Sequence, residues 1–264
     1  MKIKSTLLLT LAGGQMCLLT AGAQTVSEDF NSYANGTTIG SGTMNGGGGW
    51  YSAWQGNGQG GAVNNGVLSE NGASGGAPAY WRYFNSLGAI NSSTTYYFRA
   101  DLGANSPTSQ NEFWGAALTD NSGNRIGELI VEHTWVTSQI GSTTFTGNTA
   151  GYTPNGGLEE MLGELQWNNN SLTLSVWATP ASSPLPGSQA AAGAPTWVQT
   201  GAAPTANNLG GVLLEGFSVQ SDTTVEADNL LFGPTWASVT TVPEPSILGL
   251  LGLGGLFLSR RFRK

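Results

Sequence analysis

The sequence predicts an all-β protein in which two antiparallel sheets pack into a β-sandwich. Three observations lead to this prediction. Short segments rich in β-branched and aromatic residues recur along the chain, polar turns with Gly and Asn separate them, and almost no segment shows a helical period. The chain also has 9 Trp among its 264 residues, which supplies apolar surface for a folded core.

The chain begins with a segment typical of a secretory signal peptide. Lys2 and Lys4 precede an apolar run from about Leu7 to Leu19, and the small residues at 21–23 follow. We expect cleavage after Ala23. The chain then has three parts: a signal peptide (1–23), a β-sandwich body (24–236) and a C-terminal tail (237–264).

The body is acidic, and this excludes several classes of function. Its only bases are Arg82, Arg99 and Arg125, whereas every acidic residue except Glu244 lies in the body, and the whole chain has a net charge of −7. Such a surface repels nucleic acid, so a divalent cation or a neutral sugar is the better partner. Cys17, the single cysteine, is lost with the leader, which excludes disulfides and thiolate chemistry.

The central part of the body predicts strands joined by tight turns. The segment 94–103 (TTYYFRADLG) has strand composition, and 113–119 and 125–133 flank the polar turn 120–124 (DNSGN) as a hairpin. A second hairpin is predicted from the strands 162–167 and 171–179, which flank the polar turn NNN (168–170). In its second strand Leu, Leu and Val at 172, 174 and 176 alternate with polar residues, which indicates one buried face.

The remaining segments complete the body. The only helical signal is a single turn over 158–162. The stretch from 179 to 211 is rich in Pro, Ala and Gly and predicts a long surface loop with a short strand near Trp197. Two last strands are expected within 211–222 and 224–233.

Four segments of the body resemble a known fold family. They are EDFNSYANGTTIG (28–40), GGGGWYSAW (46–54), WATP (177–180) and VEADNLLFG (225–233). They look like parts of the laminin-G or concanavalin-like jelly-roll domains of secreted bacterial proteins. The resemblance implies the same sandwich that the strand pattern predicts.

The tail has an unusual order of residues. The apolar run Ile247–Leu258, as a short helix, spans about 18 Å, less than the roughly 30 Å of a bilayer core. Four bases follow it at the end of the chain: Arg260, Arg261, Arg263 and Lys264. By length alone this run is a poor membrane anchor. The alternatives are a marginal membrane span, with the four bases on the cytoplasmic side, and a buried terminal strand.

This order closely resembles the PEP-CTERM sorting signal of Gram-negative bacteria. Pro243, Glu244 and Pro245 match its motif, and the four terminal bases match its basic end. The resemblance implies export, transient anchoring in the membrane, and recognition by an exosortase-type membrane peptidase. It also implies release or attachment at the cell surface, often in bacteria that make exopolysaccharide.

Catalytic residues are scarce. His133, the single histidine, follows alternating strand residues and is predicted to be a satisfied sheet histidine, and no Gly-x-Ser-x-Gly elbow occurs. Jelly-roll glucanases carry a Glu-x-Asp-x-Glu type strand motif, of which only the first spacing occurs here, in Glu226 and Asp228. A further acidic group beside Gly-rich turns is predicted to form a solvated edge: Glu159, Glu160 and Glu164. We therefore predict a non-enzymatic protein, with a glycan-cleaving or glycan-modifying enzyme that uses an unrecognised carboxylate site as the alternative.

Two aromatic clusters predict carbohydrate binding, because exposed rings stack on the apolar faces of sugars. Trp50, Tyr51 and Trp54 lie among glycines, and a second cluster occupies 80–84. The candidate binding residues are Trp50, Trp54, Trp81 and Tyr83. Trp54 is the best single candidate because its Gly- and Asn-rich surroundings indicate a loop. Trp81 and Tyr83 share one strand face, so they are expected to be exposed or buried together. The alternative is that these rings fill the core.

A structural calcium ion is the last site hypothesis. Glu28 and Asp29 are expected to open the first strand and Asp228 and Asn229 the last, and such strands are often neighbours in jelly rolls. Oxygen ligands of this kind suit calcium. The alternative is that these residues satisfy turn amides. The sequence thus predicts an exported, surface-sorted binding component of an extracellular polysaccharide or matrix, with a purely structural coat protein as a further possibility.

Overall fold

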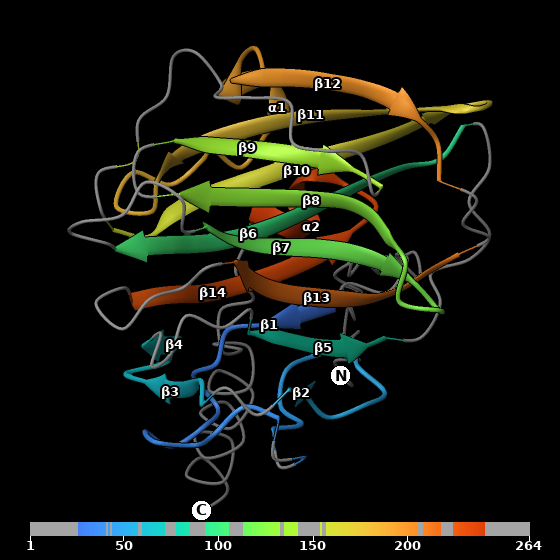
Figure 1. Ribbon diagram of the computed structural model, residues 1–264. Helices are drawn as coiled ribbons and strands as arrows, with labels where there is room; N and C mark the ends of the chain where they lie inside the picture. The colour runs from blue at the N-terminus through green and yellow to red at the C-terminus, as the bar shows by residue number, and fades with distance from the viewer. Residues whose placement is uncertain are drawn as a thin grey trace, which may run out of the picture.

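The computed structural model describes residues 26–40, 42, 44–57, 60–71, 78–84, 93–105, 113–132, 135–141, 154, 157–204, 208–217 and 224–240. Two antiparallel β-sheets make up most of this part of the chain and pack face to face (Figure 1). The predicted all-β sandwich is confirmed.

The larger sheet has eight described strands. They are β1 (Val26–Glu28), β3 (Ala62–Asn64), β4 (Val67–Asn71), β6 (Thr95–Asn105), β10 (Glu159–Asn168), β11 (Ser171–Pro180), β12 (Trp197–Ala202) and β14 (Thr224–Gly233). The spatial order is β12-β11-β10-β6-β14-β4-β3, and β1 pairs with β14 off this path. The first and last described strands are therefore neighbours, as expected for this fold.

The smaller sheet has six described strands. They are β2 (Gln55–Gly56), β5 (Ala79–Tyr83), β7 (Phe113–Asp120), β8 (Arg125–Glu132), β9 (Val136–Ile140) and β13 (Leu209–Phe217). Their order is β2-β5-β13-β7-β8-β9. The β7–β8 and β10–β11 pairs are the two hairpins that the turn sequences predicted.

The main core lies between the sheets. Alternate residues of β11 from Leu172 to Val176 are fully buried, which confirms the predicted inward face. Phe232 of β14 lies between Phe84 and Tyr96, with ring centroids 5.4 and 5.3 Å away. Because Phe84 follows β5 while Tyr96 belongs to β6, this aromatic stack joins the two sheets.

The predicted helical turn over 158–162 is wrong, because these residues enter β10. Met161 and Leu162 are neighbours on opposite faces of that strand, yet both are fully buried, since the larger sheet is covered on both sides here. A strand buried on both faces loses the alternating pattern that identifies strands. The same cover buries Glu159 and Glu160, so the predicted solvated edge is wrong at these two positions.

A second, smaller apolar cluster covers the outer face of the larger sheet. It contains Leu162, Trp177, Leu231, Trp236 and Val239, with three partly buried neighbours. The last two members belong to the helix α2 (Trp236–Thr240), so packing continues past the predicted end of the body. The long connection between β11 and β12 is present as predicted and contains the short helix α1 (Gln189–Ala192).

Several sequence predictions concern residues outside the described part of the chain. These are the signal peptide (1–23), the apolar run and sorting residues of the tail (241–264), and His133. Within the described part, no helix has both the length and the apolar character needed to span a membrane.

Candidate functional site

The outer face of the six-stranded sheet, turned away from the larger sheet, carries the candidate site. Strand alternation puts Tyr80, Arg82 and Phe84 in the interior and Trp81 and Tyr83 on the outer face, where they are partly exposed. The strand registers then define one row of side chains across all six strands of this sheet: Gln55, Trp81, Leu213, Ala117, Glu128 and Gln139.

One end of this face is an open group of aromatic rings, which we call the aromatic shelf: Tyr51, Trp81 and Tyr83. Tyr51 is 64% exposed and stacks on Tyr83, with centroids 6.1 Å apart and ring planes 18° from parallel. The indole Nε1 of Trp81 donates a hydrogen bond of 3.0 Å to Gln55, which fixes that ring at the edge strand. A Cβ at Gly211 would lie 3.0 Å from the Tyr83 ring, so glycine there lets the ring lie close to the sheet.

Charged groups follow the shelf across the same face. Arg125 of β8 forms an ion pair with Glu215 of β13, and both side chains are partly exposed. Glu128 lies beside this pair and is 2% exposed. A Cβ at Gly115 would collide with the Glu128 carboxylate, so the missing side chain leaves room for it. Burial, and then the negative charge of Glu215, raise the pKa of Glu128 well above its ordinary value. This charged cluster was not found in the sequence because Glu215 lies 90 positions from Arg125 along the chain.

The two Trp residues of the first aromatic cluster do not form an open surface: Trp54 is fully buried and Trp50 is partly buried. Trp54 is 0% exposed, and its Nε1 donates a hydrogen bond to Glu28 at 3.2 Å. The expectation that Trp54 offers an open stacking face is therefore wrong. Trp50 is partly buried, donates to the Ser27 carbonyl at 2.8 Å, and lies 4.7 Å from the Arg82 guanidinium. Both rings surround a buried charge and do not form an open surface.

That buried charge is an ion pair between the sheets. Glu28 of β1 is bonded to Arg82 of β5 at 2.5 Å, and their side chains are 0% and 1% exposed. The same carboxylate accepts hydrogen bonds from Tyr33 at 2.9 Å and from the Phe30 amide at 3.1 Å. Burial raises the pKa of Glu28, although these bonds and Arg82 favour its charged form.

The four predicted calcium ligands do not meet at one point. Glu28 lies between the sheets and pairs with Arg82, whereas Asn229 donates hydrogen bonds to Asp228 and to Asp101 on the outer face of the larger sheet, and Asp29 is near enough to Asp228 to raise its pKa. Among the described residues, no group of three or more Asp, Glu, His or Cys side chains is arranged to hold a metal ion. The predicted arrangement of ligands is therefore wrong, although the first and last strands do pair.

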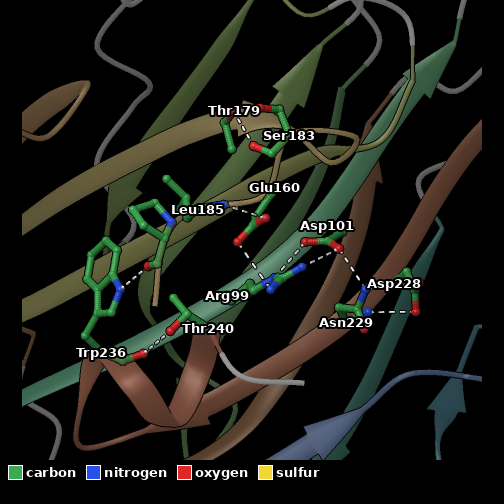
Figure 2. A network of polar contacts seen from close by, with 11 residues as sticks. Arg99, Asp101, Glu160, Thr179, Ser183, Leu185, Asp228, Asn229, Trp236 and Thr240 are labelled. Atoms are coloured by element: carbon green, nitrogen blue, oxygen red, sulfur yellow. Dashed lines mark hydrogen bonds and ion pairs between the residues drawn. The ribbon is translucent and has the colours of Figure 1, made fainter. Parts of the chain in front are cut away.

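Asp228 instead belongs to a polar network on the outer face of the larger sheet (Figure 2). Arg99 forms two hydrogen bonds of 2.9 Å to Asp101 and an ion pair of 3.2 Å with Glu160. Asn229, which adopts a positive φ of 46° at an irregularity of β14, bonds Asp101 at 2.8 Å. The network ties the strands β6, β10 and β14 together and has a structural role.

The network makes stability depend on pH. Burial, followed by the charges of Asp101 and Asp29, raises the pKa of Asp228 to about 7. The folded state keeps a proton that the unfolded chain releases near pH 4, so stability falls as the pH rises from about 4 to about 7. We expect Asp228→Asn to raise the free energy of unfolding at pH 8 by about 1–3 kcal/mol and to change it little at pH 4. Urea titrations at both pH values measure this, and an equal effect at both would contradict the assignment.

Comparisons with known proteins identify one sequence motif and several solved structures to which the chain is similar. Residues 241–264 match the model of the PEP-CTERM protein-sorting motif. The chain therefore carries this motif at its C-terminus, which implies export and membrane-associated sorting. No curated protein matches the sequence significantly.

Similar solved structures have jelly-roll folds of the lectin and concanavalin-like kind. Lectin II from Ulex europaeus is 11% identical, with 78% of this chain and 97% of that chain covered and a TM-score of 0.41. The Emp47p carbohydrate recognition domain is 10% identical, with 80% and 95% covered and a TM-score of 0.44. An endo-1,3-beta-glucanase from Streptomyces sioyaensis is 12% identical, with 81% and 96% covered and a TM-score of 0.48. At these values the similarities assign neither a ligand nor an activity to this chain.

Proposed function

We propose that this protein is exported to the surface of a Gram-negative bacterium, where it binds a neutral polysaccharide of the extracellular matrix without cleaving it. The tail provides transient membrane anchoring and is processed by an exosortase-type peptidase at Pro243–Pro245. The observation on which the binding proposal rests is the aromatic shelf, in which three rings share one open end of a sheet face.

The chemistry of the shelf suits a sugar. Pyranose rings have apolar C–H faces that stack on aromatic rings, and the stacked Tyr51 and Tyr83 offer a broad platform beside Trp81. The nearby pair of Arg125 and Glu215 supplies hydrogen-bond donors and acceptors for hydroxyl groups. The few polar groups beside an apolar platform favour a neutral sugar, in agreement with the acidic body, which repels acidic polymers.

Retention of the protein on the host's own extracellular polysaccharide tests this proposal. We expect Trp81→Ala together with Tyr83→Ala to weaken binding by about tenfold or more, because stacking residues at the centre of a site carry much of its affinity. Val198→Ala is the matched control, since Val198 is 56% exposed on the larger sheet, away from the shelf. Equal retention of all three proteins would contradict the site, and no retention of any would leave a structural coat protein.

Glycan cleavage is the second candidate because of one observation. Glu128, whose pKa is raised, and Glu215 lie on the same sheet face as the shelf. Two neighbouring carboxyl groups, one of them with a raised pKa, are the usual equipment of a general acid and its partner. Release of reducing ends from the polysaccharide, abolished by Glu128→Gln, would favour the enzyme. Binding without release favours the primary proposal.

A further inference from the structure

The helix α2 connects the folded body directly to the sorting tail. Trp236 packs edge-on against Trp177 at 4.9 Å and against Tyr97 at 6.2 Å, and its Nε1 donates a hydrogen bond of 2.8 Å to the Pro186 carbonyl. Val239, one turn later, is 0% exposed. The helix also contacts β6, the strand that carries Arg99, and Figure 2 shows both elements. The helix is thus docked on the outer face of the larger sheet, the face that lies away from the aromatic shelf.

Two buried side chains hold α2 on the sheet. The helix has five residues, of which only Trp236 and Val239 are buried. A helix this short has no stability of its own in water, so it keeps its shape only while these two side chains stay in place. Elements with so little buried surface open locally without unfolding the rest of the domain. Thr235 and Ser238 bond one another at the start of the helix.

The sorting motif begins immediately after this helix. The match starts at residue 241, directly after Thr240, and two residues separate Thr240 from Pro243. An extended chain covers at most about 3.6 Å per residue, so only about 10 Å of chain precedes the motif while α2 stays docked. Peptide-binding clefts commonly hold their ligand in an extended, strand-like form over several residues. The docked helix cannot supply such residues.

We infer that α2 is a detachable arm of the sorting signal. While docked, it withholds residues 236–240 from the sorting peptidase. When Trp236 and Val239 leave the sheet, the same residues become the extended segment that the peptidase binds ahead of the Pro-Glu-Pro motif. After cleavage the arm docks again and covers the outer face of the larger sheet. This inference rests on the proposed processing of the tail and adds the body-side part of the substrate.

Pulse–chase labelling of the full chain in its host tests the inference. Two variants extend the available segment in different ways: Trp236→Ala loosens the arm, and a short Gly-Ser insertion between Thr240 and Thr241 adds reach while leaving the helix intact. We expect both to be processed roughly threefold faster than the wild type, or more. Leu129→Ala is the control for general destabilisation, because Leu129 is buried in β8, away from α2. Its processing rate is expected to match that of the wild type.

A second measurement does not depend on the peptidase. The only cysteine of the chain, Cys17, lies in the predicted leader, so Val239→Cys introduces a single thiol that reacts with a maleimide only when the arm opens. Adding Trp236→Ala is expected to speed this labelling. Two results would overturn the arm and leave the sorting proposal standing. One is a processing rate of the insertion variant equal to that of the wild type, and the other is a labelling rate of Val239→Cys that Trp236→Ala does not change. A complete lack of processing in every chain would contradict the sorting proposal and the arm with it.

Discussion

Replacing Arg82 with alanine is expected to lower the free energy of unfolding by about 3–5 kcal/mol, because it leaves the buried Glu28 carboxylate without its cation. Arg82 is 1% exposed, and besides the 2.5 Å ion pair it donates a hydrogen bond of 2.8 Å to the Ser52 carbonyl. The pair joins β1 of one sheet to β5 of the other, so its loss weakens the contact between the two layers. Urea denaturation of the variant at pH 7 measures the effect.

The double variant Glu28→Gln with Arg82→Met is the control. It removes both charges, keeps most of the volume and keeps an amide oxygen as acceptor for the neighbouring donors, so we expect a smaller loss than for Arg82→Ala alone. Lowering the pH toward 4 is also expected to reduce the cost of Arg82→Ala, since Glu28 has a raised pKa and is then neutral. A loss below about 1 kcal/mol for Arg82→Ala would contradict a buried charge pair at this position.

Replacing Trp54 with alanine is expected to cost about 3–5 kcal/mol of stability, as for other large buried aromatic residues. Its ring is 0% exposed, lies 6.0 Å from Phe30 and 5.9 Å from Trp50, and donates a hydrogen bond to Glu28. Thermal unfolding measures the loss. The milder Trp54→Phe is expected to retain polysaccharide binding per folded molecule, whereas Trp81→Ala is expected to weaken binding and keep most of the stability. The reverse pattern would mean that Trp54 is the stacking ring.

The architecture of the body was predictable because most of its strands and turns have recognisable local sequence patterns. The β10–β11 hairpin has a tight polar turn and a regular alternation on β11, and both survive in the structure. The prediction of a helical turn over 158–162 was wrong because β10 is buried on both faces and therefore lacks the alternating pattern of a strand. Its second cover comes from α2 and from the connection before β12, which local sequence does not specify.

The site was only half predictable, for a similar reason. Alternation alone separates Trp81 and Tyr83 from the interior Arg82, and it needs only five consecutive residues of β5. The burial of Trp54 involves a hydrogen bond to Glu28, which is 26 positions away in the sequence. The charged cluster requires contact between Arg125 and Glu215, which are 90 positions apart. Gly-rich loops carry no period that reveals such partners, so the predicted loop around Trp54 did not indicate burial.

Hydroxyl-radical footprinting of the exported protein, with and without the host's polysaccharide, tests the central claim most directly. The proposed function predicts that Tyr51, Trp81 and Tyr83 lose reactivity together when the polysaccharide is bound, while Val198 on the other sheet keeps its reactivity. Protection confined to other surfaces, or no protection of the shelf at a polysaccharide concentration that retains the protein, would contradict a carbohydrate site on this face.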